Sequence, residues 1–167
     1  MPFQLQAPVL PYAIIVTMET VRPANIDDLV CCAELLGVLF SQEREFTADP
    51  AVQRKGLEMI VKKPETGTVF VYESHGVIQG MVVMLFTIST ALGDKVAILE
   101  DMVVDPDFRG KGIGASLVRY AVDYAINQGC GRITLLTDNN NEAAHAFYRK
   151  HGFTRSDMVV FRKLTGS

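Results

Sequence analysis

Apolar residues recur along this chain with helical spacing in some stretches and with the character of strands in others. The first helical stripe follows Asn25, a residue type that caps helix N-termini. Its members are Ile26, Leu29, Val30, Ala33, Leu36, Gly37 and Phe40. A second helix is expected after Asp49 and Pro50, which suit a cap and a first helical position, and it should end before Pro64. Two helices are therefore predicted in the first part of the chain.

Runs rich in β-branched residues predict the strands on either side of these helices. The first covers Tyr12 to Val21 and follows residues 1 to 11, which contain prolines and are expected to form a peripheral extension. Thr66 to Glu73 and Val77 to Ser89 are joined by Ser74-His75-Gly76, the composition of a hairpin turn. A turn at Gly93-Asp94-Lys95 then leads into the next strand. The pattern predicts one strand, two helices and an antiparallel meander.

The most informative stretch lies where a strand gives way to a helix. Ala97 to Val104 is an apolar run that stops before Pro106, and Ile113 to Gln128 has an apolar helical stripe ending at Gly129. Between them lies Arg109-Gly110-Lys111-Gly112-Ile113-Gly114, with glycines at alternate positions. The glycines therefore sit at a strand-to-helix turn.

Such a turn is suited to binding a phosphate group. The first turn of a helix has unpaired N–H groups and the positive end of the helix dipole. Glycine lets a ligand come close to the backbone, and the flanking Arg109 and Lys111 add positive charge. A Walker loop is disfavoured because Ala115 follows Gly114, and the dinucleotide fingerprint has a different glycine spacing. We expect a phosphate or pyrophosphate site.

The last third of the chain completes the predicted fold. Arg132 to Thr137 is expected to be a strand, Glu142 to Lys150 a helix that ends at Gly152, and Thr154 to Leu164 a final hairpin. Strands on both sides of a helix imply a local parallel crossover within an otherwise antiparallel sheet. The sequence thus predicts an α/β fold of the α+β type over residues 1–167. It has one domain with a mixed, mostly antiparallel sheet flanked by helices.

Composition narrows the possible functions. The chain has 167 residues, 49% of them hydrophobic, and a net charge of −3, which disfavours a nucleic-acid partner. Its three cysteines are an odd number, as expected for reduced thiols in a cytoplasmic protein, and they form no metal-binding pattern with the three histidines. The apolar stretch near the N-terminus contains prolines and is too short to span a bilayer. We expect a cytoplasmic protein with no metal and no membrane partner.

Two blocks of the sequence together resemble a known superfamily. Arg109-x-x-Gly112-x-Gly114, after a strand that contains a glutamate, resembles the acetyl-coenzyme A motif of the GNAT N-acetyltransferases. The second block, Asn141-x-x-Ala144-x-x-Phe147-Tyr148-x-x-x-Gly152-Phe153, is similar to their downstream helix and its closing turn. The resemblance covers roughly residues 65 to 164. It implies a GNAT fold with acetyl-coenzyme A as the cosubstrate.

The resemblance also implies a set of cofactor-binding residues. The strand after Asp101 would pair with the pantetheine arm, a backbone N–H near Met102 would polarise the thioester carbonyl, and the glycine loop would hold the pyrophosphate. Asn141 would contact the coenzyme, although it is equally suited to capping the next helix. The implied residues are Met102, Val103, Val104, Arg109, Gly110, Lys111, Gly112, Ile113, Gly114, Ala115, Asn141, Ala144 and Tyr148.

Two residues are candidates for the proton transfers. Tyr148 matches the family's general acid near the coenzyme sulfur, whereas without that motif it would be interpreted as a core residue. Glu100 lies at the family's frequent position for a base, and the alternative is a structural salt bridge. A carboxylate within an apolar strand needs a partner or a purpose, because burying a charge is costly. Strand alternation predicts that Glu100 and Asp101 lie on opposite faces.

The resulting hypothesis is an N-acetyltransferase that passes an acetyl group directly to a primary amine of a small molecule or peptide. One alternative is a protein lysine or N-terminal acetyltransferase, and another is a non-catalytic acyl-coenzyme A sensor. The polar connection Ser41 to Ala48 borders the acceptor site in the family, so Glu43 and Glu45 either attract a cation there or form a solvated loop. Strand edges at the N-terminal extension and the final hairpin suggest a homodimer.

Overall fold

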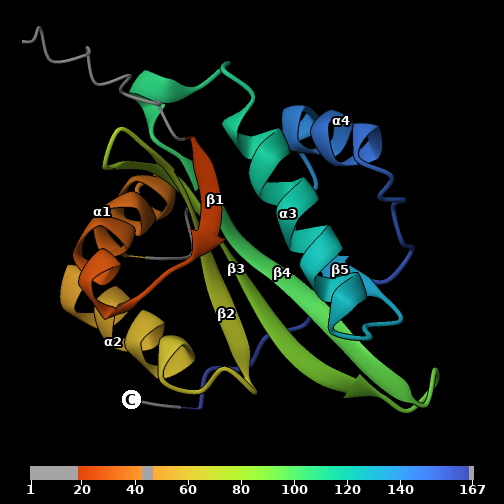
Figure 1. Cartoon of the computed structure of the whole chain (residues 1–167). Helices are drawn as coiled ribbons and strands as arrows, with labels where there is room; N and C mark the ends of the chain where they lie inside the picture. The colour runs from red at the N-terminus through yellow and green to blue at the C-terminus, as the bar shows by residue number, and fades with distance from the viewer. Residues whose placement is uncertain (1–18, 43–46, 166–167) are drawn as a thin grey trace, which may run out of the picture.

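The computed structural model describes residues 19 to 42 and 47 to 165 and contains one five-stranded sheet (Figure 1). The strands are β1 (Thr20–Pro23), β2 (Gly67–Ser74), β3 (Val77–Ser89), β4 (Asp94–Val104) and β5 (Ile133–Leu135), in that spatial order. Strands β1 to β4 are antiparallel neighbours, whereas β5 runs parallel to β4. This arrangement confirms the predicted α/β fold with a mixed, mostly antiparallel sheet.

Helices cover both faces of the sheet. A short 3₁₀ helix, η1 (Ile26–Asp28), leads into α1 (Leu29–Phe40), which lies with α2 (Pro50–Val61) on one face. A second 3₁₀ helix, η2 (Pro106–Phe108), precedes α3 (Ile113–Asn127), and α3 and α4 (Glu142–Lys150) lie on the other side (Figure 1). The helix after the glycine loop therefore packs on the opposite face from the first two helices.

Local sequence signals explain where the first helices and the hairpin begin and end. The Asn25 side chain accepts a hydrogen bond from the Asp27 N–H, and Asp28 accepts from the Asn25 N–H, which completes a capping box. Asp49 caps α2, with Pro50 at its first position. The turn between β2 and β3 places His75 and Gly76 at positive φ values of 54° and 75°. The predicted N-caps at Asn25 and Asp49 and the predicted turn between β2 and β3 are therefore confirmed.

Three predicted strands differ from the observed ones. Residues 12 to 18 of the first lie outside the described residues, and β1 continues beyond Val21 to Pro23. Strand β5 is shorter than the predicted Arg132–Thr137. The final hairpin over Thr154–Leu164 is wrong, because these residues form no strand in the described structure. Their β-branched composition favours a strand, but a strand also needs an edge to pair with, and composition carries no information about that edge.

Two hydrophobic cores lie on opposite faces of the sheet. The core under α1 and α2 contains Leu29, Leu36, Val71, Met81, Val83 and Val103. The core under α3 contains Phe70, Val82, Met84, Leu99, Leu117 and Ala121. Gly80 of β3 lets α3 come close to the sheet, since a β-carbon there would lie 3.2 Å from side-chain atoms of Ile113 and Leu117. The start of α3 is therefore held against the middle strands.

Candidate functional site

The glycine loop forms an open turn at the N-terminus of α3. Gly110 and Gly112 have positive φ values of 77° and 84°, which disfavour residues with a β-carbon. Gly112 is the N-cap of α3, and no side chain caps this helix end. A β-carbon at either glycine would meet no atom within 4 Å, so the space in front of the loop is open. The first-turn N–H groups of a 15-residue helix are thus available to an anion.

Two cationic side chains flank this turn. The Arg109 Nε donates to the Val104 carbonyl oxygen at 3.0 Å, which ties the loop to the end of β4. The Lys111 Nζ lies 4.8 Å from the centre of the Phe108 ring and 3.5 Å from the Asp107 carbonyl oxygen. Both side chains are exposed and add positive charge to the helix terminus.

Strand β4 contains a bulge just before the loop. Val83 of β3 pairs with Glu100, and Met81 pairs with Val103. Two residues of β4, Asp101 and Met102, therefore lie opposite the single β3 residue between Met81 and Val83. Asp101 adopts a φ of 45°, which is unusual for a residue with a β-carbon. The extra residue shifts the alternation of side chains along the strand. The prediction that Glu100 and Asp101 lie on opposite faces stays a prediction, because Asp101 is the residue at the bulge itself.

The bulge determines which face each candidate residue occupies. Glu100 lies opposite Val83, a member of the α1/α2 core, and therefore lies on that face. Val103 is in the same core, whereas Met102 and Val104 pack with the core under α3. Without the bulge, Leu99 and Val103 would share a face. Regular strand alternation cannot predict these faces beyond Glu100, because the extra residue appears only in the pairing of β4 with β3.

Strands β4 and β5 separate next to the bulge. Their pairing runs from Ala97 opposite Ile133 to Leu99 opposite Leu135 and ends there. In the described part of the chain, no strand lies beside Glu100–Val104 on the β5 side. The N–H and C=O groups of this edge can pair with an extended ligand, as in an added strand. This unpaired edge leads directly into the glycine loop.

Helix α4 brings the second sequence block to the same end of α3. The Asn141 side chain accepts a hydrogen bond from the Ala144 N–H at 3.0 Å, so Asn141 is a helix cap as one interpretation predicted. A β-carbon on Gly114 would lie 3.6 Å from the Phe147 ring. The two motif blocks therefore meet where α3 begins.

Tyr148 lies in an aromatic environment on α4. Its ring centre is 5.2 Å from that of Phe147 and 5.8 Å from that of Phe153. Burial raises the pKa of the Tyr148 hydroxyl. The phenol therefore stays protonated at neutral pH, which is the state that a proton donor requires.

His145 is a candidate site residue that the sequence analysis considered only as a metal ligand. Its side chain is 10% exposed, and its Nε2 lies 3.0 Å from the Asp138 carbonyl oxygen. Its buried Nδ1 has no hydrogen-bond partner and lies 3.9 Å from the Glu142 carboxylate. The described residues include no group of three or more side chains suited to holding a metal.

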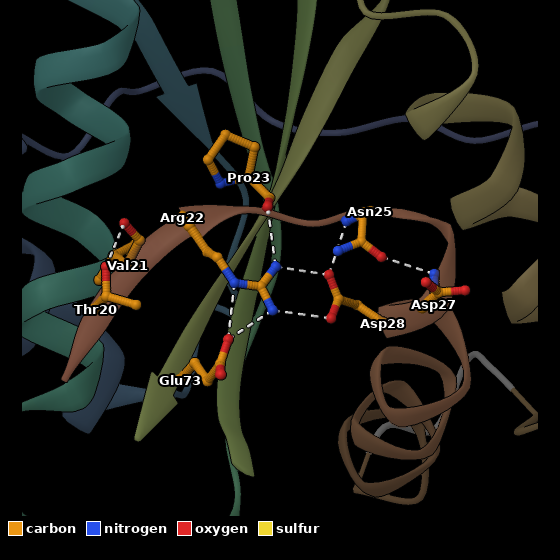
Figure 2. Close-up of polar contacts among 8 residues, drawn as sticks. All are labelled: Thr20, Val21, Arg22, Pro23, Asn25, Asp27, Asp28 and Glu73. Carbon is orange, nitrogen blue, oxygen red and sulfur yellow. Dashed lines mark hydrogen bonds and ion pairs between the residues drawn. The ribbon is translucent and has the colours of Figure 1, made fainter. Parts of the chain in front are cut away.

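A cavity of about 660 Å³ lies on the α1 side of the sheet, at the end where β4 finishes. Its lining includes Asp27, Glu34, Glu73 and Asp105. At its wall, Arg22 binds Asp28 and Glu73 together (Figure 2). The sequence analysis missed this cavity because its lining comes from four separate segments of the chain.

Two of the three cysteines have thiols whose surroundings keep them protonated. Cys32 is fully buried, and burial raises the pKa of its thiol to about 12. Cys31 is exposed beside the acidic cavity, and burial raises the pKa of Cys130. A raised pKa keeps a thiol protonated and unreactive. Cys32 is therefore a core residue, whereas the exposed Cys31 is not.

Comparison with known proteins identifies the family to which these features belong. Residues 32–153 match the model of the acetyltransferase (GNAT) family. An uncharacterised N-acetyltransferase of Bacillus subtilis is 30% identical over 143 residues, covering 84% of this chain and 93% of that protein. One from Methanocaldococcus jannaschii is 32% identical over 145 residues, covering 84% of this chain but only 62% of that protein.

The fold comparison agrees with the sequence comparison. The aminoglycoside N-acetyltransferase AAC(6′)-Iy, solved in complex with coenzyme A, superposes with a TM-score of 0.75 at 19% identity. The match covers 95% of this chain and all of that one. At this identity the likeness concerns the fold alone. No described helix has both the length and the apolar character needed to cross a membrane.

Proposed function

The chain belongs to the GNAT family of acetyltransferases, and from this premise we propose that it transfers the acetyl group of acetyl-coenzyme A directly to a primary amine of a small molecule or peptide. The observation that supports this most strongly is the unpaired β4 edge at Glu100–Val104, which ends at the glycine loop. The edge can pair with an extended pantetheine arm, and the helix terminus beyond it can bind the pyrophosphate.

The residues of the loop fit this cosubstrate. A pyrophosphate needs several N–H donors on one side and no side chains in the way, and the uncapped start of α3 with Gly110 and Gly112 meets both requirements. Arg109 and Lys111 would neutralise part of its charge. Ile113, Gly114 and Ala115 would contribute N–H groups from the first turn. Ala144 and Asn141 would line the passage at the start of α4.

Acetyl-coenzyme A supplies the activated acyl group, and the protein's own groups would orient it and move protons. A backbone N–H at the bulge, near Met102, would donate to the thioester carbonyl oxygen. Glu100 would accept the proton from the incoming ammonium group, directly or through water. Tyr148 would donate its hydroxyl proton to the departing thiolate, since its phenol is protonated at neutral pH. Because the amine attacks directly, no protein nucleophile is required.

The test is the release of free coenzyme A thiol from acetyl-coenzyme A over a panel of amines. The panel should include amino acids, polyamines, aminoglycosides and a lysine-containing peptide, with coenzyme A binding measured in parallel by calorimetry. We expect amine-dependent thiol release with at least one small primary amine. A matched tertiary amine, which cannot form the amide, serves as the negative control.

The panel also separates the alternatives. Release with the peptide but with none of the small amines would favour a protein acetyltransferase. Tight binding of acetyl-coenzyme A without release for any amine would favour a non-catalytic sensor. If acetyl-coenzyme A did not bind at all, the assignment of the glycine loop as its pyrophosphate site would be contradicted.

A further inference from the structure

The cavity of about 660 Å³ beside α1 has no part in the proposed acetyl transfer. Its volume is in the range of small-molecule pockets, roughly 300 to 1,000 Å³. Helix α1, the turn between β2 and β3, and Asp105 at the end of β4 all contribute to its lining. Glu100, the proposed base, is not among the lining residues. The cavity is therefore a preformed space of ligand size that is separate from the proposed reacting groups.

Carboxylates dominate the charge of this acidic cavity. Its lining contains five carboxylate side chains and one guanidinium, which give a net charge of −4. The carboxylates belong to Asp27, Asp28, Glu34, Glu73 and Asp105. The whole chain has a net charge of −3, so the residues outside the cavity are close to neutral in total. The negative charge of the protein is thus concentrated at one place.

Arg22 neutralises only part of this charge. Its guanidinium lies 2.7 Å from the Asp28 carboxylate and 2.6 Å from the Glu73 carboxylate (Figure 2). It also donates to the Pro23 carbonyl oxygen at 3.2 Å. These contacts hold the guanidinium at the cavity wall and pair it with two of the five carboxylates. The other three carboxylates need a different source of positive charge.

The three remaining carboxylates have no cationic partner within the described part of the chain. No lysine, arginine or histidine there forms an ion pair with Asp27, Glu34 or Asp105. The Asp105 carboxylate accepts a hydrogen bond from the Asp107 N–H at 2.9 Å, which leaves its charge in place. Like charges that face one space repel each other, and a bound cation would remove this repulsion.

The distribution of the carboxylates indicates what kind of cation fits. They do not form a group that could hold a metal ion, since no such group of three or more side chains occurs among the described residues. Separated carboxylates suit separated positive charges, and an ammonium group offers three hydrogen-bond donors to each. Between the charges the cavity has an apolar wall that can pack against methylene groups. This wall consists of Leu35, Val38, Val77 and Ile78.

We propose that the acidic cavity binds a linear aliphatic polyamine. Its ammonium groups pair with Asp27, Glu34 and Asp105, and its methylene chain lies along the apolar wall. The site is additional to the amine acceptor site at Glu100 and does not depend on acetyl transfer. Its occupancy can therefore be measured in the absence of acetyl-coenzyme A.

Calorimetry with spermidine as the probe tests the site on the full-length protein. We expect saturable binding that weakens as the salt concentration rises. Asp27→Asn/Glu34→Gln should weaken it by roughly tenfold, because two ion pairs are lost. The matched control is Glu58→Gln/Asp123→Asn, which removes the same charge from α2 and α3 and should keep the affinity. Glu100→Gln should also keep it. Spermidine binding that only Glu100→Gln weakens, or that both double variants weaken equally, would overturn the proposal.

Two further ligands test the chemical class. Hexylamine has an apolar chain but one ammonium group, and Mg²⁺ has two charges but no chain. Both should bind much more weakly than spermidine, because each satisfies only one feature of the cavity. Equal affinity for Mg²⁺ would show unspecific attraction of cations, and equal affinity for hexylamine would show that the carboxylates do not select the ligand. Either result would contradict a polyamine site.

Chemical blocking of the cavity provides an independent measurement. Cys31 is exposed and lines the cavity, so N-ethylmaleimide attached to its thiol would occupy part of the space. We expect the labelled protein to lose spermidine binding. The control is the Cys31→Ser protein treated in the same way, which should bind normally even if Cys130 is labelled. Unchanged spermidine affinity after complete labelling of Cys31 would place the ligand elsewhere and overturn the proposal.

Discussion

The guanidinium of Arg22 and the carboxylate of Asp28 meet in a bidentate ion pair, with Nη1 2.7 Å from Oδ2 and Nη2 3.0 Å from Oδ1 (Figure 2). Asp28 also accepts a hydrogen bond from the Asn25 N–H at 2.7 Å, and Arg22 contacts Glu73 of β2. The pair thus links the sheet to the start of α1. The Arg22 hydrogen bonds lower the pKa of Asp28, although burial partly opposes them.

This pair predicts a pH-dependent loss of stability. A carboxylate whose pKa is lower in the folded state stabilises the protein above its unfolded pKa of about 4, and this contribution disappears as the pH falls through the folded value. Asp28→Asn should therefore lower the free energy of unfolding by about 1 to 3 kcal/mol at pH 7. The difference from the unmodified protein should shrink towards pH 3. Urea unfolding between pH 3 and pH 7 measures both the loss of unfolding free energy and its dependence on pH.

Glu58→Gln is the matched control for this substitution. Glu58 pairs with Lys62 one turn along α2, but both side chains are exposed, and such pairs contribute little. Its removal should leave the urea midpoint almost unchanged. If Asp28→Asn behaved like Glu58→Gln at pH 7, the pair would have no structural role.

A second prediction concerns the glycine loop. Valine at position 112 would have to adopt a φ near 84°, which should cost about 1 to 3 kcal/mol of stability, and its side chain would occupy the open space in front of the loop. We therefore expect Gly112→Val to fold but to lose acetyl-coenzyme A binding. In thermal unfolding, a hundredfold excess over the dissociation constant should stabilise the unmodified protein by about 2.7 kcal/mol, or roughly 5 to 10 °C.

Gly129→Val provides the control for backbone strain. Gly129 follows the other end of α3, has a φ of 75° and also has no atom within 4 Å of its β-position. This variant should show a similar loss of intrinsic stability but keep the full shift with acetyl-coenzyme A. A Gly112→Val protein that is stabilised as strongly as the Gly129→Val protein would rule out the loop as the binding site.

The sequence predicted those parts of the fold that depend on local chemistry. Asn25, Asp49 and the turn at His75-Gly76 have the predicted roles because caps and tight turns depend on neighbouring residues only. The bulge at Asp101 was missed because it appears only when β4 is aligned with β3. The cavity lined by Asp27, Glu34, Glu73 and Asp105 was missed because it depends on contacts between distant segments. The roles of Glu100 and Tyr148 stay predictions that require kinetic measurements.

Glu100 should show its role in the pH dependence of the rate. If its carboxylate accepts the proton of the incoming amine, Glu100→Gln should lower kcat/KM at neutral pH. The rate should recover as the pH rises, because a larger share of the acceptor is then already neutral. Asp123→Asn, at an exposed carboxylate on α3, is the control and should keep the normal profile. A Glu100→Gln profile parallel to that of the unmodified enzyme would assign the base to water or another residue.

The last prediction concerns the proton that the leaving thiolate receives. Tyr148→Phe keeps the ring that packs on Phe147 and Phe153 and removes only the hydroxyl, so the affinity for acetyl-coenzyme A should be almost unchanged. The rate of the chemical step should fall by roughly a hundredfold to ten-thousandfold, the usual contribution of general acid catalysis. Because burial raises the pKa of Tyr148, its deprotonation should not limit activity below pH 10. Tyr120→Phe, which removes a hydroxyl from α3 while keeping the ring contact with Phe70, is the matched control and should retain normal turnover. Single-turnover measurements separate chemistry from product release, and normal single-turnover rates for Tyr148→Phe would show that its hydroxyl is not the acid.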